Sequence, residues 1–141
     1  RLSGPQFIQR AAKEGVYMSY SRADEVFTLE LHDYLTEAGI DVWLDMIDAP
    51  DDRDWDSEVI AAQTSSGLMV AILSPEALAD EALQAERSQF NQSGKLILPV
   101  LHRHCECQNP QSWLPVIDCA NDLERGLQSL LRILQGKSLA V

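Results

Sequence analysis

Two polar segments of the chain carry residue types that bind metal ions. Between Asp45 and Glu58, seven of fourteen residues are acidic and only Arg53 is basic. Hard cations such as Ca²⁺ need several carboxylate oxygens, but this run lacks the spacing of a calcium loop and its central glycine. A solvated, self-repelling loop, interrupted by Pro50, therefore explains the acidic run better than a metal site does.

The second segment is His-Arg-His-Cys-Glu-Cys at residues 102–107. It holds zinc or copper ligand types, but successive positions of an extended segment point to opposite sides, and no second pair of ligands has metal-binding spacing. Three serines, Ser65, Ser66 and Ser74, have no His or Asp at the spacing of a catalytic triad. We therefore predict neither a metal site nor a serine nucleophile.

The elements that must position any site follow from the apolar pattern. Short apolar runs at residues 16–20, 40–45, 68–73, 96–101 and 116–118 read as strands, with helical periodicity between most of them. The continuous run 68–73 indicates burial on both faces, as in a parallel sheet covered by helices. This alternation predicts an α/β fold: a flavodoxin-like open parallel five-stranded sheet with helices on both faces.

Local signals place several boundaries. Ser21 with Asp24, and Asn121 with Glu124, read as helix caps, and Ser74-Pro75 reads as a cap followed by the first helical residue. Pro99 suggests that the strand at 96–101 is an edge or carries a bulge. Residues 1–14 show no clear period and read as a linker or lead-in, residues 15–136 as the domain, and 137–141 as a tail.

Composition limits the classes of function. The 141 residues are 45% apolar with a formal charge of −11, which indicates one globular domain that nucleic acids and anionic membranes would repel. No apolar run approaches the length of a membrane helix. Three cysteines, an odd number, suggest reduced thiols and a cytoplasmic location. Because the chain opens at Arg1, we expect it to be a fragment of a longer protein.

In an open parallel sheet, ligands bind at the carboxyl ends of the strands. Those ends carry Tyr20 to Arg22, Asp45 with the acidic loop, and Ser74. A phosphoryl-accepting receiver needs acids after its first strand, an Asp after its third and a Lys after a later one, and the chain lacks this set. A flavin mononucleotide site needs a phosphate loop rich in small residues, whereas Ser21-Arg22-Ala23-Asp24 contains no glycine.

A series of short motifs over residues 15–134 resembles, in order and spacing, a TIR (Toll/interleukin-1 receptor) domain of the bacterial type. The motifs are Val16-Tyr17-Met18-Ser19-Tyr20-Ser21-Arg22-Ala23-Asp24, Gly39-Ile40-Asp41-Val42-Trp43-Leu44-Asp45, Trp55, Leu73-Ser74-Pro75, Glu86, and Gly94-Lys95-Leu96-Ile97-Leu98-Pro99-Val100. The resemblance implies a cytoplasmic domain, in bacterial defence or signalling, that either assembles with other TIR domains or cleaves NAD⁺ at its nicotinamide glycosidic bond.

For the enzymes of this family, the resemblance implies a catalytic Glu eight residues before the Gly-Lys pair, which is Glu86 here. Nicotinamide leaves as a neutral molecule, so no general acid is needed, and the barrier is dominated by positive charge developing on the ribose. One carboxylate against the ribose can stabilise that charge. NAD⁺ is then the substrate rather than a bound cofactor, and the product is ADP-ribose or a cyclic isomer.

The same resemblance implies which other residues act. Those lining the nucleotide cleft are Tyr20, Ser21, Arg22, Trp43 and Asp45. Those of the family's BB loop, which contacts a neighbouring protomer, are Asp48, Asp51, Asp52, Arg53 and Trp55. The chain departs from the family pattern at Ala82, where an aromatic residue is usual, and in the BB loop, where a Gly is common. The alternative function is a non-catalytic module that recruits other TIR domains.

Overall fold

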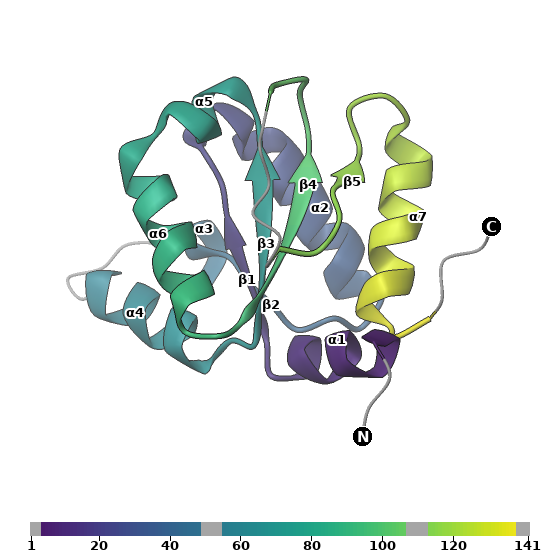
Figure 1. The fold of residues 1–141 in the computed structure, drawn as a ribbon, viewed down its shortest axis with the longest axis horizontal. Helices are drawn as coiled ribbons and strands as arrows, with labels where there is room; N and C mark the ends of the chain where they lie inside the picture. Colours follow the sequence, from purple (N-terminus) through teal and green to yellow (C-terminus); the bar gives the residue numbers. More distant parts are fainter. Residues whose placement is uncertain (1–3, 49–54, 107–112, 138–141) are drawn as a thin grey trace.

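The computed structural model describes residues 4–48, 55–106 and 113–137, and within them five parallel strands form one sheet (Figure 1). The strand order is β2-β1-β3-β4-β5, which is that of flavodoxin-like folds. The strands are β1 (Val16–Ser19), β2 (Val42–Trp43), β3 (Leu68–Leu73), β4 (Leu96–Leu101) and β5 (Ile117–Asp118). The fold class predicted from the sequence is confirmed.

Helices cover both faces of the sheet, because successive side chains of each strand point to opposite faces. The helices are α1 (Gly4–Lys13), α2 (Glu25–Glu37), α3 (Asp45–Asp48), α4 (Trp55–Ser65), α5 (Pro75–Ala79), α6 (Glu81–Gln92) and α7 (Leu123–Leu134), with a 3-10 turn at Arg22–Asp24. On one face, α1, α2 and α7 pack against residues such as Val16, Val70 and Leu98. On the other, α4, α5 and α6 meet Tyr17, Met69 and Ile97.

Residues 1–14, which read as a linker or lead-in, contain a helix that the sequence did not predict, because Gly4–Lys13 form α1. Its inner side chains join the apolar core on the face of the sheet that α2 and α7 also cover. Ala12 is buried in this core, and Ile8 and Ala11 pack against the core. The helix also lies against α7 at the opposite end of the chain, as Figure 1 shows. A ten-residue helix has too few turns to show a clear period by itself, and its stability comes from tertiary packing.

The prediction for Pro99 was wrong, because β4 lies between β3 and β5 and pairs with β3 without a bulge. The backbone alternation explains why proline is tolerated there. The carbonyls of Ile97 and Leu101 accept hydrogen bonds from Leu114 and Cys119, on the β5 side. Pro99 shares their orientation, so its missing N–H costs no bond to β3, and β5 pairs only with Val100 and Leu101.

Of the three predicted helix caps, the structure confirms one and corrects two. The Ser74 hydroxyl accepts the Ala77 N–H at 3.2 Å and caps α5, with Pro75 following it. The Ser21 hydroxyl accepts the Ala23 N–H, but it caps the 3-10 turn that precedes α2. The cap of α7 is Asp122 rather than Asn121.

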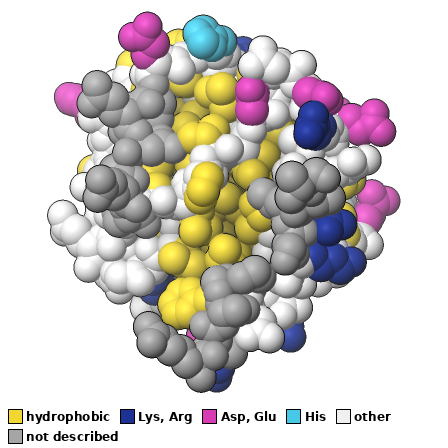
Figure 2. Space-filling model, turned by 45° about the vertical axis from the view of Figure 1, so that its right-hand side comes forward, with side chains coloured by type: hydrophobic (Ala, Val, Ile, Leu, Met, Phe, Trp, Pro, Cys, Tyr) yellow, Lys and Arg dark blue, Asp and Glu magenta, His cyan; other side chains and the backbone are white. Residues whose placement is uncertain are grey.

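The molecule retains some apolar surface. Figure 2 shows hydrophobic side chains gathering on one face of the molecule. Phe7, Val26, Ile60 and Leu123 come from four different helices and are each more than half exposed, and single exposed apolar residues are common on folded proteins. None of the helices described is both long and apolar enough to cross a membrane.

Candidate functional site

Glu86 lies half-buried on α6 with its carboxylate held by two donors. The Tyr17 hydroxyl donates to Glu86 Oε2 at 2.9 Å, and the Gln63 amide nitrogen donates to the same oxygen at 2.8 Å. Gln63 also donates to the Tyr17 hydroxyl at 3.3 Å. The side chain is therefore directed inward by residues of β1 and α4, and it does not extend freely into solvent.

Tyr17 remains a donor because it stays protonated. It is only 4% exposed, and burial, followed by the negative charge of Glu86, raises the pKa of its hydroxyl well above the ordinary value. The ring of Trp43 stacks on the ring of Tyr17 with centroids 5.5 Å apart and an interplanar angle of 11°. Trp43 therefore supports the residue that bonds Glu86.

A cleft of about 410 Å³ opens beside Glu86, on the face of the sheet that α4 and α6 cover. It extends to the turn after β1 and to the first residue of α3. Its lining residues are Tyr17, Met18, Tyr20, Ser21, Arg22, Asp45, Val59, Asp80, Ala82, Leu83 and Glu86. The structure thus brings Glu86 together with four of the five residues expected to line the nucleotide cleft.

The cleft combines a basic side chain with several acidic ones. Arg22 is exposed and contributes a positive charge, while Asp45, Asp80 and Glu86 contribute carboxylates. The Tyr20 hydroxyl donates to Asp45 Oδ1 at 2.6 Å. Burial, and then this hydrogen bond, raises the pKa of Tyr20, so its hydroxyl is protonated. The turn after β1 and the start of α3 are thereby joined at the cleft.

Other residues singled out in the sequence lie elsewhere. Trp43 contributes to the cleft only through its stacking on Tyr17. Asp48 is exposed, and its Oδ2 accepts the Leu44 N–H at 2.8 Å. Asp51, Asp52 and Arg53 fall outside the described residues, as does the side chain of Trp55, so the expected BB loop contacts stay predictions.

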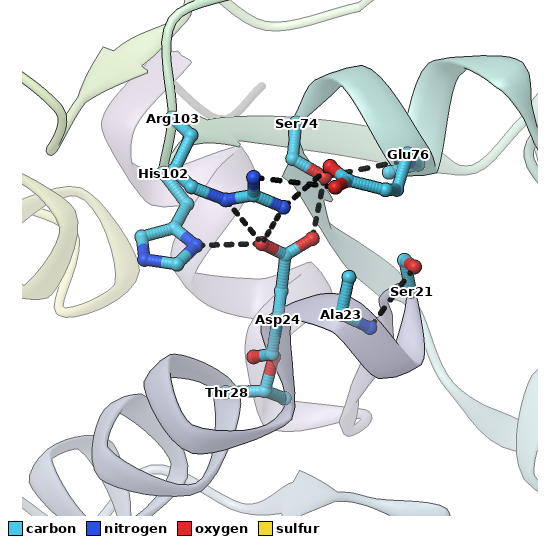
Figure 3. Close-up of polar contacts among 9 residues, drawn as sticks. Ser21, Ala23, Asp24, Thr28, Ser74, Glu76, His102 and Arg103 are labelled. Carbon is cyan, nitrogen blue, oxygen red and sulfur yellow. Dashed lines mark hydrogen bonds and ion pairs between the residues drawn. The ribbon is translucent and has the colours of Figure 1, made fainter.

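Ser74 belongs to a buried polar network that the sequence did not reveal, drawn in Figure 3. Its centre is Asp24, which is 1% exposed. The Ser74 hydroxyl donates to Asp24 Oδ2 at 2.5 Å, and His102 Nδ1 lies 2.8 Å from Asp24 Oδ1. Arg103 donates to the same oxygen through Nε at 3.1 Å and Nη2 at 3.0 Å, and Nη2 also reaches Glu76.

The network keeps a buried carboxylate charged. Burial acts to raise the pKa of Asp24, but the hydrogen bonds from Ser74, His102 and Arg103 outweigh it and hold that pKa below its ordinary range. The sequence pattern predicts Asp24 as part of a helix cap, but its side chain turns inward toward the residues that follow β3 and β4. Those partners are separated by 50 to 79 residues, so no local pattern links them.

His102, the first residue of the segment 102–107, makes contacts within the protein. His102 bonds Asp24, and its ring stacks on Phe27 with centroids 4.0 Å apart. Over the residues that the structure describes, no group of three or more His, Cys, Asp or Glu side chains is placed to hold a metal ion. Cys107 lies outside them.

Comparison with known proteins gives a family match and matches to solved structures. A family model described as TIR domain matches residues 16–131. Among solved structures, the crystal structure of the TIR domain of the Toll-related receptor TRR-2 from Hydra magnipapillata superposes with a TM-score of 0.68 at 21% identity. The match covers 85% of this chain and 97% of that one, and at this identity it supports the fold alone. A search of curated proteins finds no significant match.

Proposed function

This chain belongs to the TIR domain family, and on that premise we propose that it is an NAD⁺ glycohydrolase. It cleaves the bond between nicotinamide and ribose and releases nicotinamide. Water then bonds to the ribose carbon and loses a proton to give ADP-ribose, or a nitrogen of the substrate's own adenine bonds to that carbon to give a cyclic isomer. The observation that carries the proposal is the position of Glu86. Its carboxylate borders the same cleft as Tyr20, Ser21, Arg22 and Asp45.

The proposed chemistry asks little of the protein beyond a well-placed negative charge. As the glycosidic bond breaks, positive charge develops on the ribose, and nicotinamide departs neutral. Glu86 accepts hydrogen bonds from the ribose hydroxyls and stabilises this cation electrostatically. A preorganised group of this kind lowers the activation barrier by about 3 to 4 kcal/mol. Arg22 offsets the negative charge of the pyrophosphate.

We further propose that activity depends on self-association. TIR domains interact with one another, and the BB loop, including Asp48, Asp51, Asp52, Arg53 and Trp55, is the segment expected to meet a neighbouring protomer. Asp45 of α3 and Val59 of α4, the two helices on either side of this segment, line the described cleft. We also propose a cytoplasmic setting for this assembly, because an odd number of cysteines suggests reduced thiols.

The test is to incubate the concentrated domain with NAD⁺ and to quantify free nicotinamide. Wild type should release it, and Glu86→Ala should release it roughly 100-fold more slowly or not at all. The matched control is Glu81→Ala, which removes an exposed carboxylate from the first turn of the same helix. It should retain activity. Equal rates for wild type and Glu86→Ala would refute the catalytic role of Glu86.

The alternative is a non-catalytic module that recruits other TIR domains. The structural similarity to the TIR domain of a Toll-related receptor supports this recruiting module as the second candidate function. Both functions require assembly, so the discriminating sample is one shown by sedimentation to be oligomeric. Absence of nicotinamide from such a sample would favour the recruiting module over the enzyme.

A further inference from the structure

We propose that Tyr17 and Gln63 are positioning residues that fix the orientation of the Glu86 carboxylate in the cleft. The inference rests on the proposed glycohydrolase function and extends it to two residues that were not among the site residues expected from the sequence. Neither residue is expected to react. Their role is to present one oxygen of Glu86 to the ribose in a fixed direction.

The hydrogen bonds divide the two carboxylate oxygens between protein and ligand. Both donors end on Oε2, at 2.9 Å from Tyr17 and 2.8 Å from Gln63. A carboxylate oxygen has about two favourable acceptor positions, and these two donors fill those of Oε2. Oε1 is then the oxygen available to the hydroxyls of a bound sugar.

Each donor is itself held by its surroundings. Tyr17 is buried in the middle of β1 and stacked on Trp43. Gln63 lies near the C-terminus of α4, where Lys95 donates to the Gln63 carbonyl at 2.8 Å and to the Thr64 carbonyl at 2.7 Å. A cation at a helix C-terminus stabilises the last turn. Groups fixed in this way position a neighbour more accurately than free side chains do.

The need for positioning comes from the space around Glu86. A second hollow, of about 420 Å³, lies between α4 and α6, and Glu86 borders both this hollow and the cleft. An unrestrained glutamate has several rotamers, so its carboxylate could turn away from the cleft. Gln63 borders the second hollow as well, and its bond to Oε2 restrains Glu86 from that side.

The experiment removes each donor while keeping the side-chain size. In Gln63→Met and Tyr17→Phe, the NAD⁺ turnover number kcat should fall roughly tenfold, as expected for losing a hydrogen bond to a charged group. The KM for NAD⁺ should stay within about twofold, because the lost contact acts on the transition state more than on binding. The matched control is Gln89→Met, an exposed residue of α6 that borders the same hollow.

The outcomes separate the inference from the function on which it rests. Full activity in Gln63→Met and Tyr17→Phe, beside an inactive Glu86→Ala, would overturn the positioning role and leave the glycohydrolase intact. An equal loss of kcat in Gln89→Met would overturn it too. Absence of activity in wild type would instead refute the proposed function.

A measurement that needs no activity completes the test. A double-mutant cycle on the free energy of unfolding, with Gln63→Met and Glu86→Ala, measures whether the two side chains interact. The destabilisation caused by Gln63→Met should largely disappear when Glu86 is already alanine. Simple additivity of the two effects would contradict the proposed contact.

Discussion

At the scale of single residues, Asp24 links segments that are distant in the sequence. It follows β1, and its carboxylate forms hydrogen bonds with Ser74, which follows β3, and with His102 and Arg103, which follow β4. A buried carboxylate with this many donors is expensive to alter, since an amide would turn an N–H₂ group toward donors. Asp24 therefore fixes the strand ends near which the cleft opens.

We expect Asp24→Asn to lower the free energy of unfolding by about 2 to 3 kcal/mol. This is less than for a fully buried ion pair, because the Arg103 side chain is 41% exposed and stays partly solvated. Urea denaturation measures the change. Asp33→Asn is the matched control, because the Asp33 side chain is 72% exposed, and it should change stability little. Similar values for the two variants would contradict the role given to Asp24.

The effect should depend on pH with a definite sign. The pKa of Asp24 is lower in the folded protein than its ordinary value, so the unfolded chain binds a proton more readily. The stabilisation is complete above the ordinary aspartate pKa of about 4, and is lost as the pH falls toward the folded value. The wild-type and Asp24→Asn stabilities should therefore converge on acidification below about pH 4. Parallel curves would count against this explanation.

Ala82 is the residue at which the cleft differs from the usual family pattern. It lies one turn before Glu86 on α6 and lines the same cleft, so a larger side chain there would reach the proposed substrate. We expect Ala82→Trp to lower the KM for NAD⁺ roughly fivefold, the effect of one aromatic stacking contact. Steady-state kinetics measure it, with Ala85→Trp, at an exposed position of the same helix, as control. An unchanged KM would show that no ring of the substrate lies near residue 82.

At the scale of elements, the sequence predicted what depends on local pattern and missed what depends on distant contacts. The continuous run Leu68–Leu73 predicted a strand buried on both faces, and it is one. In contrast, α1 becomes stable only by packing on the sheet and α7, and Pro99 is tolerated because β5 is short. Within the cleft, family motifs indicated Glu86, while its partners Tyr17 and Gln63 meet it across separations of 69 and 23 residues.

The packing of α1 can be tested at Gly67. A Cβ added there would lie 2.4 Å from the Ala11 carbonyl oxygen and 2.6 Å from Glu14 Oε1. A backbone carbonyl cannot move without its helix, so Gly67→Ala should displace α1 and lower the free energy of unfolding by about 1 to 3 kcal/mol. Amide hydrogen exchange across residues 6–13 should accelerate. With Ser65→Ala as an exposed control, unchanged exchange in Gly67→Ala would contradict the close approach.

At the scale of the whole molecule, charge opposes the assembly on which activity is proposed to depend. A formal charge of −11 means that two copies repel each other. Salt shortens the range of this repulsion, from about 10 Å at 0.1 M to about 3 Å at 1 M. Self-association, and with it nicotinamide release per protomer, should therefore rise with salt concentration. Sedimentation and activity measured over the same salt series should rise together.

The acidic BB loop allows a local contribution to be separated from the total charge. Asp51→Asn with Asp52→Asn removes two charges from the segment expected at the protomer contact, and should strengthen self-association at low salt and weaken its salt dependence. The control, Asp33→Asn with Glu37→Gln, removes two charges from the exposed surface of α2. If the two double variants sediment alike, the repulsion belongs to the whole molecule and the loop has no special place in the contact. A larger shift for the loop variant supports its position at the interface, because charge interactions between protomers weaken steeply with distance.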